Sequence, residues 1–220
     1  LIGKEMVNSG EKRLKVLVAG AHPDDPETGA GGTICKYTEA GHDVVILYLT
    51  SGEAGIAGTS HKEAARIRTE EATKACAVLK ARSIFFGQID GDTVMTQEWR
   101  NKMNKIFESE KPDVVLTHWP IDTHIDHRIC SSLIFDAWLN AEKKSALYYF
   151  EVCTGGQTQN FSPTHFVDIS AVIRKKWEAC FFHESQRVRE DYHKDHAKME
   201  LFRGIEKNAE YGEGFVHQWL

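Results

Sequence analysis

The sequence predicts an α/β fold in which a mainly parallel β-sheet is covered by helices on both faces. Continuous apolar runs rich in β-branched residues, such as 14–21 and 43–50, are typical of strands buried on both sides. Helix-sized segments alternate with these runs through short connections. The 220 residues show no break in composition, and a single hydrophobic core can grow to this size. We therefore expect one domain over residues 1–220, with 1–13 as a polar N-terminal extension.

The first half of the chain supplies a βαβ unit and its continuation. A helix over residues 33–41, closed by Gly41 as a C-cap, joins the first two strands. The elements expected next are a helix at 61–81, a short strand at 83–87 and a helix at 96–111.

The second half begins with a buried strand at 113–118, directly after Pro112. A helix at 126–143 follows, in which four apolar residues recur at helical spacing: Ile129, Leu133, Ala137 and Trp138. Strands at 146–152 and 165–169 and two helices, near 170–183 and 187–210, complete the predicted order.

Composition excludes several classes of partner. The net charge is -5 and acidic and basic residues are interleaved, so we expect no nucleic acid as a partner. The sequence contains no run of eighteen apolar residues, which is about the length needed to span a membrane. The five cysteines are scattered and never form a CxxC pair, which favours reduced, mostly buried thiols. We expect a cytoplasmic protein, and whether an upstream targeting segment was removed stays open.

Two segments with unusual chemistry follow predicted strands, at the edge where ligands bind in sheets of this type. AHPDDPETGAGGT (21–33) follows the first strand, and THWPIDTHIDHR (117–128) follows the strand at 113–118. His22 and Asp25 are three residues apart on a loop and can present a nitrogen and an oxygen to one metal ion. The second segment offers the candidates for a third ligand: His118, His124, Asp126 and His127.

Two histidines and one carboxylate, with an open position for water, are typical of a catalytic metal site. If Asp25 binds the metal, the neighbouring Asp24 is free to act as general base on the activated water. His124, kept cationic by Asp126, can then donate to the oxyanion or to the leaving amine. This set of residues describes a metal-assisted hydrolase.

Each pattern also has a structural interpretation. The HPD tripeptide is common in turns, and an HxDH segment can simply begin a helix, with its aspartate near the positive end. Gly29, Gly31 and Gly32 permit close packing of a helix on a strand. Arg68, with Glu70 and Glu71, fits a solvated helix face. Both clusters nevertheless fall at the carboxyl ends of strands in one sheet, which favours the functional interpretation.

The segment AHPDDPETGAGGT resembles the AHPDD-x-E-x-G-x-GGT signature of the LmbE-like, or PIG-L, metal-dependent deacetylases. HIDH (124–127) is similar to the second motif of that family, HPDH. Further blocks resemble the family in the expected order: LTSGEAG, RIRTEEATKACAVL, FFGQIDG, FSPTHFVDIS and FFHESQ. The resemblance extends from Lys15 to about Phe215.

This resemblance implies a Rossmann-like, three-layer α/β/α fold and a metal-dependent N-deacetylase. Its expected reaction is zinc-dependent removal of the acetyl group from an N-acetylated sugar, commonly an N-acetylglucosamine conjugate. The implied metal ligands are His22, Asp25 and His127. Asp24 is implied as general base and His124 as the group that stabilises the tetrahedral intermediate, oriented by Asp126. Arg68 and His183 are implied as substrate-binding residues.

The sequence departs from the family pattern at two positions, Ile125 in place of proline and Pro26 in place of an aliphatic residue. The ligand set also suits iron(II), and homo-oligomerisation stays open. Two other functions are weighed: an inactive sugar-binding relative of the same fold, and a nucleotide-binding module. Against the second, the glycines form no GxGxxG after the strand, and two aspartates would face a pyrophosphate.

Overall fold

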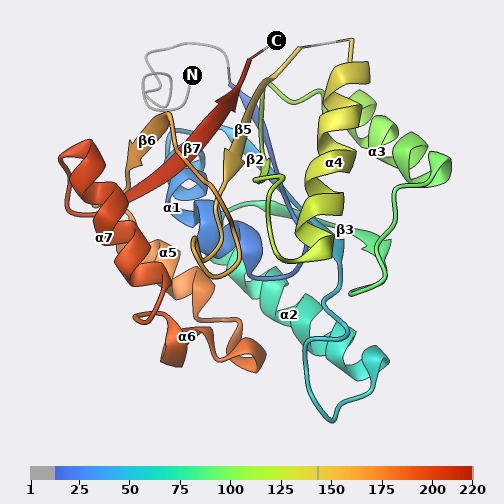
Figure 1. Cartoon of the computed structure of the whole chain (residues 1–220), viewed down its shortest axis with the longest axis horizontal. Helices are drawn as coiled ribbons and strands as arrows, with labels where there is room; N and C mark the ends of the chain where they lie inside the picture. The colour runs from blue at the N-terminus through green and yellow to red at the C-terminus, as the bar shows by residue number, and fades with distance from the viewer. Residues whose placement is uncertain (1–12, 143, 220) are drawn as a thin grey trace.

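A seven-stranded sheet forms the middle of the molecule in the computed structural model, which describes residues 13–142 and 144–219 (Figure 1). The strand order is β3-β2-β1-β4-β5-β7-β6. The strands are β1 (Lys15–Gly20), β2 (Asp43–Thr50), β3 (Arg82–Gln88), β4 (Val114–His118), β5 (Ala146–Phe150), β6 (His165–Asp168) and β7 (Gly212–Gln218). The first five strands are parallel to one another, and β7 runs antiparallel to both β5 and β6.

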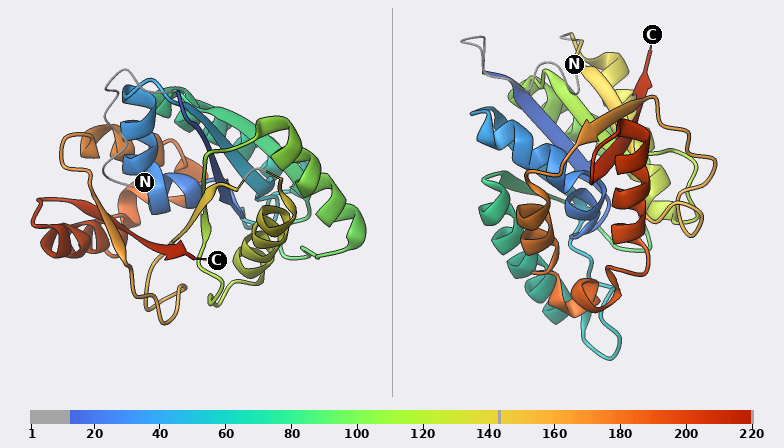
Figure 2. Two further views of the ribbon diagram at one scale, coloured as in Figure 1. Left: turned by 90° about the horizontal axis from the view of Figure 1, so that it is seen from above. Right: turned by 90° about the vertical axis from the view of Figure 1, so that its left-hand side faces the viewer.

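Helices cover both faces of this sheet, which confirms the predicted three-layer architecture (Figure 2). Val16 and Val18 of β1 face a core shared with α1 (Asp25–Glu39), α2 (His61–Leu79) and α5 (Ile173–Cys180). Leu17 and Ala19 face a second core, shared with α3 (Gln97–Glu110) and α4 (Ile125–Asn140). Successive side chains of a strand point to opposite faces, so a strand between two cores must be apolar at every position.

The helix after β1 begins at Asp25, whereas the sequence predicted a start at residue 33. Pro26 occupies the first turn, where its missing N–H has no intrahelical partner to lose. The predicted end is confirmed, because Gly41 follows the helix with a φ of 84°. The whole candidate segment therefore consists of a four-residue loop and two turns of helix.

The C-terminal region differs more from the prediction. In place of the helix expected at 187–210, the structure has η1 (Glu184–Gln186), α6 (Val188–Asp191) and α7 (His196–Lys207). Strand β7 was not predicted at all. Gly212 and Gly214 lower the β-propensity of its sequence, and both lie against Arg203 of α7, with too little room for a Cβ at Gly212.

Glu213 of β7 ties the last strand to the first helix. Its carboxylate is buried and accepts hydrogen bonds from the backbone N–H groups of Gly32 and Thr33, each at 2.8 Å. Lys176 of α5, also buried, donates to the same carboxylate at 2.8 Å. A buried carboxylate is tolerated when it is paired and hydrogen-bonded in this way.

Two further expectations concern the whole chain. All five cysteines are free, and four of them are buried, which confirms the predicted reduced thiols. Among the described residues, no helix is both long and apolar enough to cross a membrane. The predicted extension at 1–13 lies, apart from Arg13, outside the described residues.

The glycines of α1 generate a stability prediction. A Cβ on Gly32 would lie 2.5 Å from Ile169 Cγ2, inside the core, whereas one on Gly31 would meet the Lys176 stem at 3.0 Å. We expect Gly32→Ala to lower the free energy of unfolding by about 1–3 kcal/mol through overpacking. Urea unfolding followed by circular dichroism measures the effect.

Gly31→Ala is the matched control, because it adds the same methyl group one position earlier in the same helix. It should cost less, since a lysine stem moves more easily than a buried isoleucine. A Gly32→Ala protein at least as stable as Gly31→Ala would contradict the packing argument.

Candidate active site

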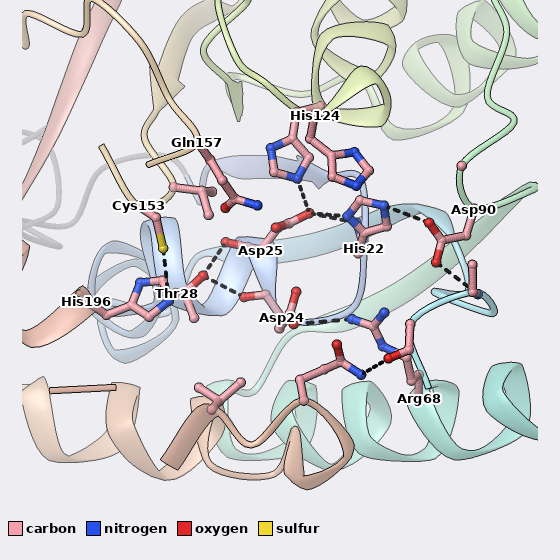
Figure 3. Close-up of a pocket in the computed structure, with 17 residues that line it drawn as sticks. His22, Asp24, Asp25, Thr28, Arg68, Asp90, His124, Cys153, Gln157 and His196 are labelled. Atoms are coloured by element: carbon pink, nitrogen blue, oxygen red, sulfur yellow. Dashed lines mark hydrogen bonds and ion pairs between the residues drawn. The ribbon is translucent and has the colours of Figure 1, made fainter. Parts of the chain in front are cut away.

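Both candidate segments lie at the carboxyl ends of β1 and β4. These strands are parallel neighbours, with Ala19 beside Thr117, and β2 lies on the other side of β1. The strand order reverses here, at the position where ligands bind in open α/β sheets. A cavity of about 430 Å³ opens at this edge (Figure 3). Its walls include both segments, the loops after β2 and β3, and residues of the 152–157 and 186–196 regions.

Asp25 lies at the centre of the three predicted metal ligands. Its Oδ2 is 3.2 Å from His22 Nδ1 and 3.4 Å from His127 Nε2. His22 and His127 also belong, with His124, to a group whose ligand atoms all lie within 4.8 Å of one another. Burial would raise the pKa of Asp25, but the surrounding histidines, His127 foremost, outweigh it and hold the pKa well below its usual range.

The outer nitrogens of the two histidines also contact carboxylates. His22 Nε2 lies 3.0 Å from Asp126 Oδ2 and 3.2 Å from Asp90 Oδ1. His127 Nδ1 lies 3.2 Å from Asp122 Oδ1. Metal-bound histidines usually donate their second ring N–H to such a partner, which fixes the tautomer and the ring orientation. The described residues near Asp25 form three groups of side chains whose ligand atoms are close enough to hold a metal ion: His22, His124 and His127; Asp25, His118 and His127; and His22, Asp90 and Asp126. The predicted ligands His22, Asp25 and His127 all belong to these groups, although no single group contains all three.

The charge around His22 is compatible with a metal ion. Burial lowers the pKa of His22, yet its contacts with Asp126, Asp25 and Asp90 raise it well above the ordinary value. The surroundings therefore favour positive charge at this position.

His118 also approaches Asp25, at 3.3 Å, and belongs to another cluster of ligand-type atoms with Asp25 and His127. Its Nε2, however, accepts the backbone N–H of Ala21 at 2.9 Å, so the lone pair of this nitrogen is already used. Burial, followed by the charge of His127, lowers the pKa of His118 to about 4. The His118 ring stacks on His127 at 4.1 Å and supports it as a neutral side chain.

Asp24 lines the cavity and has an unusual backbone conformation, with φ 115° and ψ -34°. Positive φ is rare for a non-glycine residue, and a strained conformation of this kind costs about 1–3 kcal/mol. Its side chain caps no backbone N–H of α1 and contacts Arg68 at 3.2 Å. Burial raises the pKa of Asp24 to about 6, against the charge of Arg68, a value suited to a general base near neutral pH.

The carboxylate of Asp126 lies closer to His22 than to His124, the residue that it was expected to orient. Its Oδ2 is 4.0 Å from His124 Nδ1 and contacts His22 instead. The carboxylate also accepts hydrogen bonds from the Gly91 N–H at 2.8 Å and the Thr93 hydroxyl at 2.6 Å. Asp126 therefore contacts the outer nitrogen of His22, one of the predicted metal ligands.

His124 is also not held as a cation. The backbone N–H of Asp126 donates to His124 Nδ1 at 3.2 Å, which requires a lone pair there and leaves the ring proton on Nε2. Burial, together with the charges of His22 and His127, lowers the pKa of His124. The lowered pKa and the hydrogen bond at Nδ1 favour a neutral imidazole over the expected cation, and the side chain lines the cavity.

The two substrate-binding candidates occupy different places. Arg68 lines the cavity, although it is only 3% exposed. His183 is completely buried, lies 3.5 Å from Glu27 and is not part of the cavity wall. Its neighbour Gln186 does line the cavity and donates to the Gly55 carbonyl at 3.1 Å.

Sequence reasoning missed the carboxylates of Asp90 and Asp122. Asp90 comes two residues after the end of β3, the strand predicted at 83–87. Asp122 precedes His124 by two residues. The argument that located His22 also applied to Asp90, since both follow parallel strands that end at the same edge.

Comparison with known proteins decides the family. The family model described as "PIG-L: GlcNAc-PI de-N-acetylase" matches residues 17–138, more than half of the chain. The chain belongs to the PIG-L family. The description of the family model and the names of several relatives of this PIG-L protein support an N-deacetylase.

Individual relatives agree with the family match. The diacetylchitobiose deacetylase of Thermococcus kodakarensis is 34% identical over 188 residues, which cover 78% of this PIG-L chain and 70% of the relative. The solved structure of the N,N′-diacetylchitobiose deacetylase from Pyrococcus horikoshii, in complex with an inhibitor, superposes with a TM-score of 0.83 at 26% identity. That match covers 93% of this chain and 83% of the other.

One PIG-L relative has a different named activity. The 4-oxalmesaconate hydratase of Pseudomonas putida is 25% identical over 224 residues, covering 93% of this chain and 85% of the relative. The proteins to which this chain is similar along most of its length are therefore named for two reaction types.

The contacts around His22 and His127 predict a graded loss of metal affinity. We expect His127→Ala to abolish tight binding of added Zn²⁺, because one of three ligands is removed. Asp126→Asn should weaken binding about 10–100-fold, as expected for a partner of a ligating histidine. Competition with a zinc-sensitive chelating dye measures both.

Asp92→Asn is the control for the loss of a carboxylate, since Asp92 lies exposed on the same loop as Asp90 and should bind Zn²⁺ like the parent protein. Unchanged affinity in Asp126→Asn would show that this carboxylate does not support His22.

Proposed function

We propose that this protein is a zinc-dependent hydrolase that removes the acetyl group from an N-acetylglucosamine-type sugar conjugate. The observation that carries the proposal is the grouping of His22, Asp25 and His127 around one point, with Asp24 beside it in the cavity. The names of the relatives support the substrate class, because two of them describe deacetylases of an acetylated amino-sugar disaccharide.

The proposed ligands are two imidazole nitrogens and one carboxylate oxygen, a set that suits zinc and also iron(II). When bound, a divalent cation polarises the amide carbonyl and lowers the pKa of water. Metal analysis of the purified protein distinguishes zinc from iron(II).

The proposed role of Asp24 is to remove a proton from the attacking water and to pass it to the leaving amine. Its carboxylate reaches the cavity, with 21% of the side chain exposed. A positioned general base contributes about 10²–10⁴-fold to the rate.

His124 is proposed to stabilise the tetrahedral intermediate as a neutral donor. Its Nδ1 accepts the Asp126 N–H, which directs the remaining N–H, on Nε2, away from the backbone of α4. A donor with a fixed orientation stabilises developing negative charge without reorganisation during the reaction.

We also propose a partner and a location for this protein. The partner is a small N-acetylated sugar, and the protein acts in the cytoplasm. Its oligomeric state is independent of the proposal.

The direct test is release of free amine and acetate from N,N′-diacetylchitobiose and from simple N-acetylglucosamine glycosides. We expect turnover with about one Zn²⁺ bound per chain, and loss of turnover with a chelator followed by recovery on addition of Zn²⁺. Absence of amine release across the panel, with the metal in place, would overturn the proposal.

If no amine is released, two further assays distinguish the remaining functions. Sugar binding without turnover would indicate an inactive relative, and hydration of an unsaturated carboxylic acid would indicate the activity of the hydratase relative.

Asp24→Asn tests the general base. The amide preserves the shape of the side chain and removes its basicity, so kcat should fall about 10²–10⁴-fold while Zn²⁺ stays bound. Kinetics and metal content are measured on the same preparation. Full activity in this variant, with metal bound, would eliminate Asp24 as the base.

A further inference from the structure

Arg68 contacts both the peptide unit before Asp24 and the side chain of Asp24. Its Nη2 donates to the carbonyl oxygen of Pro23 at 2.6 Å. The same nitrogen donates to Asp24 Oδ2 at 3.2 Å, a contact drawn in Figure 3. The Pro23 carbonyl belongs to the peptide unit that precedes Asp24, so one nitrogen holds both that peptide and the carboxylate. These contacts fix the backbone and the side chain of a residue whose φ of 115° is strained.

The β2–α2 loop covers the same guanidinium. Arg68 Nη1 donates to the Gly52 carbonyl at 3.2 Å. A Cβ at Gly52 or Gly55 would lie 2.4 or 2.3 Å from Nη1. The glycines therefore allow the loop to close directly over the arginine, which is only 3% exposed.

Few donors of Arg68 are left for a substrate. A guanidinium has five N–H groups, and three hydrogen bonds to Pro23, Asp24 and Gly52 use three of them. The Nε group is buried without a partner. A residue that mainly bound sugar hydroxyls would be expected to keep its donor fork open to the cavity.

We propose that Arg68 is a positioning residue, which holds Asp24 in its strained conformation with the carboxylate in the cavity, and is not a substrate-binding residue. The proposal rests on the base role proposed above for Asp24. Misplacing a reacting group by about 1 Å can cost about 100-fold in rate, so this role affects kcat, whereas sugar binding would affect KM.

Arg68→Met tests this role, because methionine keeps an unbranched apolar stem and removes all donors. With N,N′-diacetylchitobiose and the zinc-loaded protein, we expect kcat to fall about 100-fold while KM changes less than about threefold. Arg66→Met is the matched control, since Arg66 is an exposed arginine of the same helix paired with Glu63 and Glu70; it should leave both constants unchanged. A large rise in KM with kcat retained would overturn the proposal.

Arg68→Lys provides the test if methionine prevents folding. A lysine ammonium has the charge but lacks the planar fork that contacts two acceptors at once. We expect an intermediate loss of kcat, again at unchanged KM. Activity equal to the parent protein would mean that the charge alone is sufficient, which would overturn the two-point contact.

Binding separates the two roles without catalysis. In the Asp24→Asn background, calorimetric titration with N,N′-diacetylchitobiose should give the same Kd, within about twofold, with and without Arg68→Met, because effects that act through Asp24 do not add. A tenfold weaker Kd in the double variant would show that Arg68 binds the sugar.

A crystal structure of the folded Arg68 variant gives a readout that does not depend on the proposed activity. Asp24 should leave the positive-φ region, and its carboxylate should leave the position seen in Figure 3. An unchanged residue 24 would overturn the proposal even if the parent protein proved to have another activity, whereas a parent protein that releases no amine would overturn only the function proposed above.

Discussion

The parallel pairing of β1 with β4 is the constraint on which the candidate site depends. Their register places Ala19 beside Thr117, so the residues that follow β1 meet those that end β4. His22 and Asp25 come from the first strand, and His127 comes from the helix reached through the second. Residues about one hundred positions apart in the chain thus share one point, and the buried sheet beneath them keeps that point rigid.

Much of the fold was predictable because a strand covered on both faces has a simple sequence signature. The runs at 43–50 and 113–118 are apolar throughout, since each strand contributes alternate side chains to two cores. The start of α1 was not predictable in the same way. Gly29, Gly31 and Gly32 disfavour a helix by propensity, yet the space beside Phe150 and Ile169 admits no side chain at two of these positions. Tertiary packing decided the local structure there, and likewise in β7.

In the candidate site, too, some residues could be predicted from the sequence and others could not. Spacing within the first segment pointed to His22 and Asp25 as ligands, but it left several candidates in the second segment, and His127 was named only through the resemblance to the PIG-L family. The carboxylates behind these histidines were harder to assign. The Asp126 carboxylate lies 3.0 Å from His22 and 4.0 Å from its sequence neighbour His124, whose Nδ1 accepts the backbone N–H of Asp126. Which side chains meet across a fold depends on the conformation of the loops, and loop conformation has no periodic pattern in the sequence.

The contact between Glu213 and the middle of α1 has a consequence for how the molecule is assembled. Every predicted metal ligand has been synthesised once residue 127 has been made, but the carboxylate that holds the Gly32 and Thr33 backbone is almost ninety residues further on. β7 also enters the sheet between two strands made earlier. A nascent chain can therefore have all its predicted ligands and still lack the strand that anchors the ligand-bearing helix, so the contacts of the site are complete only after β7 has been made.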